Sequence, residues 1–155
     1  MIKINKDKGI LFWITGLSGS GKTTLGKAIH RDINKLYGPT LMISGDDLRK
    51  IFDLKGYDYE QRLQITKKYC KFVKYITNQK INIIFAVVGM FYEARKWNKK
   101  KIYKKINPGK IIGIDIKPEY PINPDITILN NFKNSEKKMK DFLIKKINVL
   151  INEKK

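Results

Sequence analysis

The chain has 155 residues, of which 42% are hydrophobic, and this length fits one domain with a single buried core. The apolar run 10–14 is too short to span a bilayer, and the basic start MIKINKDKG lacks the apolar core and cleavage site of a signal peptide. We therefore expect a cytoplasmic protein with no membrane partner. The single cysteine, Cys70, excludes an internal disulfide and is expected to pack on a helix.

The formal net charge of +19 favours polyanions as partners, nucleic acid among them. However, 29 of the 33 basic residues are lysine, and Lys, Ile and Asn together fill 66 of the 155 positions, a bias that A/T-rich codons would produce. We therefore interpret lysine runs such as 99–101 mainly as solvated surface, with steering of an anionic substrate as the alternative. Nucleic acid is not expected as a partner.

Strand-like and helical patterns alternate from the start of the chain. The apolar run GILFWIT, residues 9–15, predicts a strand, and apolar residues at helical spacing predict a helix over 22–37. Gly38 and Pro39 end this helix, and TLMIS, residues 40–44, predicts a second strand.

The same alternation continues in the second half. An amphipathic helix is predicted over 58–78 and a third strand at INIIFAVV, residues 81–88. The segment DITILN, residues 125–130, predicts a fourth strand. A closing helix is predicted over 134–152, capped by Asn134 or Ser135.

Strands separated by helices predict a parallel sheet with helices on both faces. The helices are expected to bury Leu25, Ile29, Ile33, Leu36, Leu63, Tyr69, Cys70, Val73, Ile76, Met139, Phe142, Leu143, Ile147 and Leu150. No repeat or linker interrupts the pattern, so residues 1–155 are expected to form a single α/β domain of three layers.

The first predicted strand runs directly into ITGLSGSGKTT, which contains the P-loop pattern Gly-x-x-x-x-Gly-Lys-Thr. Backbone N–H groups of such a loop turn toward phosphate oxygens, Lys22 would reach the β- and γ-phosphates of ATP, and the Thr23 hydroxyl would ligate Mg²⁺. The predicted ATP-binding residues are Gly16, Leu17, Ser18, Gly19, Ser20, Gly21, Lys22, Thr23 and Thr24. The alternative, a glycine-rich turn without a ligand, leaves Lys22 without a role.

A second polar cluster, SGDDLRKIF, follows the second predicted strand. Because ligand groups gather at the carboxyl ends of parallel strands, Asp46 and Asp47 are expected to face the same crevice as the P-loop. Asp46 would bind Mg²⁺ through water or accept the proton of an attacking hydroxyl, and Arg49 would hold an anionic acceptor. The alternative is that an aspartate caps the short helix that follows, and for Asp47 both interpretations stay open.

Six motifs in this order resemble adenylylsulfate kinases: GLSGSGKTT, SGDDLR, KGYDYEQR, IIFAVVGMFYEAR, KKIYKKINPGK and GIDIKPEYPINPD. The resemblance implies a P-loop NTPase-type fold and transfer of the γ-phosphoryl of MgATP to the 3′-hydroxyl of a nucleotide whose 5′ end carries a modified phosphate. It implies that Lys22 and Asp46 are catalytic, with Asp46 nearest the acceptor hydroxyl. A homodimer is left open.

The resemblance also implies an acceptor site. Arg49 and Arg62 would grip the phosphate region of the acceptor, Tyr57 would stack on its base, and Lys100 would belong to a mobile basic lid over about 99–115. The expected substrate-binding residues are completed by Val88, Gly89, Ile111 and Ile112. Gly89 would either let the acceptor's diphosphate approach the backbone or form a tight turn after the strand.

Several positions depart from the family pattern. Ile65 stands where the family has Asn, Gly89 where it has Ser, and Met90-Phe91-Tyr92 where it has PYR or PHR, while the lid Phe and Thr are missing. The donor half is therefore intact and the acceptor half is rebuilt. This pattern looks like the branch that phosphorylates cytidine diphosphoramidate, used in surface-polysaccharide decoration. The alternatives are adenylylsulfate, another nucleoside or small alcohol, and a non-enzymatic nucleic-acid binder.

One further departure concerns chain length. Between Trp97 and Lys100 the family carries an additional strand and the start of the lid helix, and here KWNKKKIYKK runs straight across. A central strand cannot be deleted without reorganising the sheet. Either a segment is missing from this sequence near residues 98–101 or the sheet has lost a strand, and we expect the former.

Overall fold

Three parallel strands form the sheet in the computed structural model of the chain, which describes residues 7–89, 91, 124–128 and 135–152. The strands are β1 (Leu11–Thr15), β2 (Thr40–Ser44) and β3 (Asn82–Val87), in the order β1-β3-β2. Each of the three predicted strands is confirmed within two residues at either end. Because all three run in the same direction, their carboxyl ends meet along one edge of the sheet.

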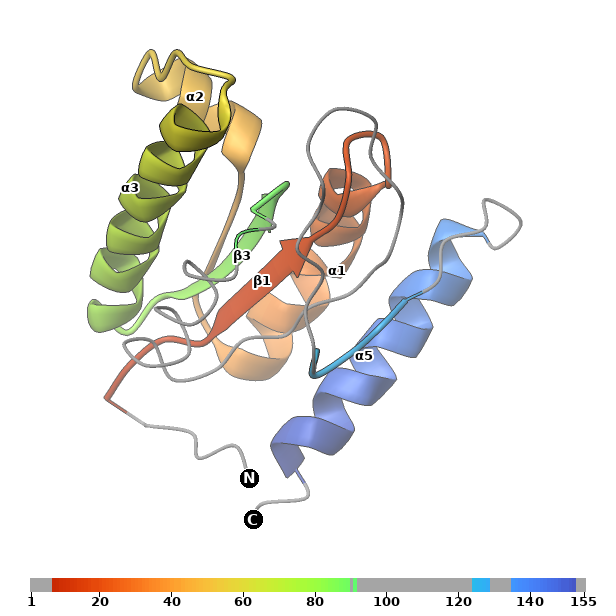
Figure 1. Cartoon of the computed structure of the whole chain (residues 1–155). Helices are drawn as coiled ribbons and strands as arrows, with labels where there is room; N and C mark the ends of the chain where they lie inside the picture. Colours follow the sequence, from red (N-terminus) through yellow and green to blue (C-terminus); the bar gives the residue numbers. More distant parts are fainter. Residues whose placement is uncertain (1–6, 90, 92–123, 129–134, 153–155) are drawn as a thin grey trace.

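The helices cover both faces of this sheet. Figure 1 shows α1 (Lys22–Tyr37) and α5 (Glu136–Asn152) on one side and α2 (Gly45–Ile51) with α3 (Tyr59–Asn78) on the other. This arrangement confirms the predicted three-layer α/β fold with a parallel sheet. Among the described residues, no helix is long and apolar enough to cross a membrane.

The core consists of two apolar clusters, one on each face of the sheet. Alternating residues of β1 supply both, because Phe12 and Ile14 pack toward α1 and α5 whereas Leu11 and Trp13 pack toward α3. Cys70 is 2% exposed within the second cluster, as expected of a helix-packing residue.

Two predicted core residues are exposed instead. Leu36 is 50% exposed, because Tyr37 packs against the core at the end of α1 in its place. Phe142 is 45% exposed, since it lies off the stripe that Leu143 and Ile147 form on α5. The helical spacing of apolar residues therefore predicted the buried face of these helices correctly, but it did not predict where that face ends.

The predicted fourth strand at 125–130 is wrong for its described part. Residues 125–128 form no strand, although Ile126 and Ile128 are 4% and 7% exposed and belong to the cluster under α1 and α5. Alternating apolar residues indicate a segment with one buried side, but they do not by themselves specify the hydrogen bonds that join a strand to a sheet. Residues 129 and 130 lie outside the described residues.

A buried asparagine joins the three strands at the opposite edge from their carboxyl ends. The Asn82 side chain is 4% exposed, its Oδ1 accepts from Ile10 N at 2.8 Å, and its Nδ2 donates to the carbonyl oxygens of Tyr37 at 2.9 Å and Gly38 at 3.2 Å. Removing a side chain of this kind leaves buried backbone groups without partners.

Replacing Asn82 with alanine is therefore expected to lower the free energy of unfolding by about 3 kcal/mol. Urea unfolding followed by circular dichroism would measure this as a lower midpoint with an unchanged slope. Asn78→Ala, at an exposed position in the last turn of α3, is the matched control. A loss no larger than in the control would contradict the stabilising role of Asn82.

Candidate active site

A pocket of about 590 Å³ opens at the carboxyl edge of the sheet. Its walls come from the loop after β1, the start of α2 after β2, the residues after β3, and the first turns of α3. Predicted site residues that line it are 17–19, 21–24, Asp46, Arg49, Tyr57, Arg62, Val88 and Gly89. Gly16 and Ser20 belong to the same loop but not to this lining, and Lys100, Ile111, Ile112 and the predicted lid at 99–115 lie outside the described residues.

The loop between β1 and α1 has the backbone of a phosphate-binding turn. Gly19 and Gly21 adopt φ values of 73° and 80°, in the left-handed region that favours glycine. Gly21 is the N-cap residue of α1 and has no side chain that could cap the first turn. The N–H groups of that turn, together with the helix dipole, therefore form a site for an anion.

Lys22 lies over this loop. Its Nζ donates to the carbonyl oxygen of Leu17, which also accepts from Ser20 N at 3.3 Å. Burial lowers the pKa of Lys22, and the nearby carboxylate of Asp46 partly raises the same pKa. Lys22 and Asp46 both line the pocket and are thus electrostatically coupled within it.

The two aspartates after β2 have different surroundings. Asp47 and Ser44 form a capping box, in which Ser44 Oγ accepts from Asp47 N at 3.1 Å and Asp47 Oδ2 accepts from Ser44 N at 2.8 Å. The hydrogen bonds from Ser44 lower the pKa of Asp47. Asp47 is therefore the N3 residue of the capping box whose N-cap is Ser44, whereas Asp46 lines the pocket.

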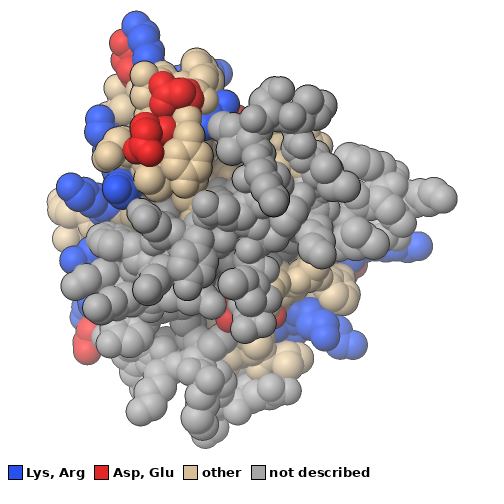
Figure 2. Space-filling view, in the orientation of Figure 1, with Lys and Arg blue, Asp and Glu red and all other residues tan. Residues whose placement is uncertain are grey.

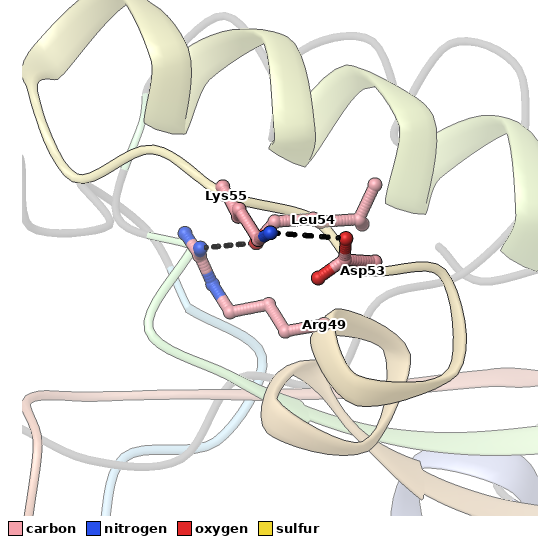
Figure 3. Close-up of polar contacts among 4 residues, drawn as sticks. All are labelled: Arg49, Asp53, Leu54 and Lys55. Atoms are coloured by element: carbon pink, nitrogen blue, oxygen red, sulfur yellow. Dashed lines mark hydrogen bonds and ion pairs between the residues drawn. The ribbon is translucent and has the colours of Figure 1, made fainter.

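Arg49 holds the loop that follows α2. Its two terminal nitrogens donate to the carbonyl oxygens of Leu54 at 2.9 Å and Gly56 at 3.1 Å, and Figure 3 shows the side chain extending from α2 toward Leu54. Beside it, the exposed Lys55 and Asp53 form an ion pair at 3.2 Å. Part of the hydrogen-bonding capacity of Arg49 is thus used within the protein, and its contact with an acceptor stays a prediction.

Two arginines converge on Tyr57. The guanidinium carbons of Arg49 and Arg62 lie 4.9 Å and 5.5 Å from the centroid of the Tyr57 ring, within the range of a cation–π interaction. Arg62 also donates through Nε to the Tyr57 carbonyl oxygen. The cluster gives the pocket two positive charges, as expected for an anionic acceptor, while the Tyr57 ring already has cationic partners.

Gly89 is a glycine for reasons of packing. An added Cβ would lie 2.9 Å from the Trp13 ring and 3.2 Å from Val87, so any side chain would displace the core. The residue is buried and lines the pocket, which leaves its predicted contact with the acceptor open.

The sequence analysis missed several residues in the pocket wall. Tyr59, Tyr69 and Phe91 line it, and the Tyr69 hydroxyl donates to the carbonyl oxygen of Gly45 at 2.9 Å, directly before Asp46. Burial raises the pKa of Tyr69, with smaller effects from Arg49 and Asp46. The helical spacing of Tyr59, Arg62 and Tyr69 in α3 was the available signal.

The donor groups present fit Mg²⁺. The Thr23 hydroxyl and the Asp46 carboxylate line the same pocket, and both supply the oxygen atoms that this cation prefers. In the described part of the chain, no three His, Cys, Asp or Glu residues group together as a metal cage. Such a sparse donor set suits an ion that keeps several waters and is shared with the phosphates of a substrate.

Positive charge converges in the pocket. Of the described residues that line it, Lys22, Arg49 and Arg62 are cationic and Asp46 is acidic. On the face that Figure 2 shows, the described Lys and Arg side chains are dispersed, and acidic side chains lie among them. The field within the pocket therefore favours an anionic ligand.

A comparison of the sequence with known proteins finds one matching family and several similar kinases. A profile of the family described as adenylylsulphate kinase matches residues 8–106. The cytidine diphosphoramidate kinase of Campylobacter jejuni is 29% identical over 168 residues, covering 92% of this chain and 98% of that protein. The adenylyl-sulfate kinase of Clostridium acetobutylicum is 29% identical over 170 residues, covering 92% of this chain and 84% of that protein.

Solved structures have the same fold. The APS kinase of Mycobacterium tuberculosis in complex with AMPPNP and APS superimposes with a TM-score of 0.76, at 18% identity, covering 91% of this chain and 98% of that one. The arrangement of strands, loop and helices described above is thus shared with proteins of known structure.

Proposed function

The chain belongs to the adenylylsulphate kinase family and is a phosphotransferase, and from this premise we propose that it transfers the γ-phosphoryl of MgATP to the 3′-hydroxyl of cytidine diphosphoramidate. The observation that carries the proposal is the pocket itself, whose lining brings together the phosphate-binding loop with Lys22, the nearby carboxylate of Asp46, and Arg62. In this proposal, the residues that bind the phosphoryl donor and those that bind the phosphoryl acceptor line the same pocket.

The phosphate-binding loop, Thr23 and Asp46 each have a part in this reaction. The loop 16–23 and the first turn of α1 hold the β- and γ-phosphates of ATP, and Lys22 offsets negative charge on the group being transferred. Asp46 accepts the proton of the acceptor hydroxyl or orients it for attack. Thr23 and Asp46 would hold Mg²⁺, which supplies neutralisation of phosphate charge when bound.

The acceptor is inferred from two features. Arg49 and Arg62 suit an acidic acceptor, and the aromatic side chains beside them suit a flat base. Cytidine diphosphoramidate is favoured for two reasons. The alignment with the Campylobacter jejuni enzyme covers 98% of that protein, and Tyr92 stands where the adenylylsulfate kinases have an arginine. An uncharged amide in place of sulfate removes one demand for positive charge.

Adenylylsulfate is the second candidate. The Clostridium acetobutylicum adenylyl-sulfate kinase has the same 29% identity to this chain, and the donor half of the site would serve either acceptor equally. The proposal includes a cytoplasmic location, and a homodimer is compatible with it.

A panel of acceptors tests the proposal. Adenylylsulfate, cytidine diphosphoramidate, CDP, CMP, gluconate and shikimate are each assayed with MgATP and the unmodified protein, and kcat/KM is expected to be highest for cytidine diphosphoramidate. A preference of about tenfold or more for adenylylsulfate, equivalent to about 1.4 kcal/mol in transition-state binding, would assign the protein to the second candidate. Activity on gluconate or shikimate alone would contradict both.

A further inference from the structure

Tyr57 is the shared contact of two arginines in the pocket wall. We propose that its ring is a positioning group, which holds the guanidinium groups of Arg49 and Arg62 where they bind the acceptor's phosphate, and that it is not the platform for the acceptor's base. The guanidinium carbons lie 4.9 Å and 5.5 Å from the ring centroid, and all three residues line the pocket. The inference rests on the proposed function, because it assumes that the acceptor carries a phosphate beside these arginines.

The backbone of Tyr57 is fixed by the first turns of α3. Its N–H donates to Gln61 Oε1 at 3.1 Å, and its carbonyl oxygen accepts from Arg62 Nε. Directly before it, Gly56 has a φ of 122°, and an added Cβ there would lie 2.7 Å from the Gln61 side chain. The chain therefore turns tightly against α3 at this point, and the position of Tyr57 beside Arg62 is set by local hydrogen bonds.

Arg49 reaches the same ring from a different helix. It belongs to α2, and its terminal nitrogens donate to the carbonyl oxygens of Leu54 at 2.9 Å and Gly56 at 3.1 Å, in the loop that leads to Tyr57. The guanidinium group is thus held against the loop, with the Tyr57 ring beside it. Because Arg62 belongs to α3, the ring is the point at which the cations of the two helices meet.

The electrostatics of this contact favour an anion. Two guanidinium groups near one ring repel each other, and the negative face of an aromatic ring attracts both and offsets part of that repulsion. Within the part of the chain that the structure describes, no carboxylate forms an ion pair with Arg49 or Arg62. The Tyr57 ring can therefore hold the two cations near each other without neutralising them, and both keep the charge that attracts a phosphate.

A role for Tyr57 in stacking on the base fits these contacts less well. The residue is 69% exposed, and a base on its ring would have to share that ring with two cations. The two roles also differ in what they predict for a ligand without a base. A stacking ring contributes nothing to the binding of such a ligand, whereas a ring that positions the arginines contributes as much as it does for a nucleotide.

NMR titrations of the protein with CMP and with ribose 5-phosphate, which lacks the base, test the inference. A non-hydrolysable ATP analogue and Mg²⁺ are present at saturation, so that the phosphate-binding loop is occupied. Tyr57→Leu is expected to raise both Kd values by a similar factor of about five to thirty, the loss expected from two exposed cation–π contacts. Tyr57→Phe keeps the ring and should bind both ligands as the unmodified protein does.

Two controls accompany the titrations. The Kd for the ATP analogue and the melting temperature of Tyr57→Leu should stay close to the unmodified values, because the side chain is mostly in solvent. Tyr75→Leu is the matched variant, since Tyr75 is 65% exposed on α3 and is not among the residues that line the pocket.

The outcomes separate this inference from the proposed function. A higher Kd for CMP alone would make Tyr57 a base-stacking residue and overturn the inference. Equal losses in Tyr57→Phe and Tyr57→Leu, changes no larger than in Tyr75→Leu, or no binding of either ligand to the unmodified protein would overturn it as well. A protein that phosphorylates adenylylsulfate in place of the cytidine nucleotide would contradict the proposed acceptor alone. The titration is then decided with AMP, which carries the same ribose 5′-phosphate.

Discussion

Replacing Lys22 with alanine is expected to lower kcat for phosphoryl transfer by about a thousandfold or more, because the variant loses the positive charge that offsets charge on the transferring group. The side chain is held over the phosphate-binding loop by its hydrogen bond to Leu17, close enough to Asp46 for that carboxylate to affect its pKa. Release of ADP with the best acceptor of the panel, followed under single-turnover conditions, measures the loss.

Two further readouts separate loss of charge from loss of fold. Lys27→Ala removes an exposed lysine of the same helix and should leave kcat unchanged, while thermal unfolding of Lys22→Ala should match that of the unmodified protein. Burial lowers the pKa of Lys22 below the ordinary 10.5, so Lys22 should lose its positive charge as the pH rises through this lowered pKa. The affinity for MgATP should fall over the same pH range, and this fall should be absent in the variant. A variant with the unmodified kcat would show that Lys22 is not catalytic.

Replacing Asp46 with asparagine is expected to lower kcat by a factor of about a hundred to ten thousand, the range typical of a lost general base. The substitution keeps the size of the side chain but removes its charge, at an exposed position in the first turn of α2 that faces the pocket. Binding of MgATP should weaken much less than turnover, since the phosphate-binding loop is unchanged. Isothermal titration with a non-hydrolysable ATP analogue and single-turnover kinetics separate the two effects.

Asp53→Asn is the matched control for Asp46. Asp53 follows the same helix and pairs with Lys55 at the surface (Figure 3), and it is not among the residues that line the pocket. Its backbone has a φ of 45°, which asparagine tolerates as well as aspartate. Equal kcat values for Asp46→Asn and Asp53→Asn would contradict the catalytic role of Asp46.

The features that could be predicted from sequence are those that local physics specifies. The phosphate-binding loop needs glycines at particular backbone angles, and the buried strands are short, continuous apolar runs. Each of these signals lies within a few consecutive residues, so the loop and the strands could be predicted. The sequence favoured Asp46 as the catalytic carboxylate but left Asp47 open between a capping role and a ligand-facing role, because both roles use the same residue type at the same helix start. The hydrogen bonds between Ser44 and Asp47 assign Asp47 to the capping box.

The features that could not be predicted depend on packing between distant segments. Tyr59 and Phe91 are far apart in the chain and meet only because α3 lies against the sheet near the end of β3. The segment 125–128 was predicted as a strand where none forms. Its residues are alternately buried, as in a strand, but its backbone forms no ladder of hydrogen bonds. The proposed omission near 98–101 lies outside the described residues and stays a prediction, which intact-mass measurement would test.

The most direct test of the central claim is the identity of the phosphorylated product. The protein is incubated with MgATP and cytidine diphosphoramidate, and the products are examined by ³¹P and ¹H NMR. The account predicts one new phosphomonoester coupled to the ribose 3′ proton, formed in a one-to-one ratio with ADP. Release of ADP with inorganic phosphate alone, or a phosphoryl group at any position other than the 3′-hydroxyl, would contradict it.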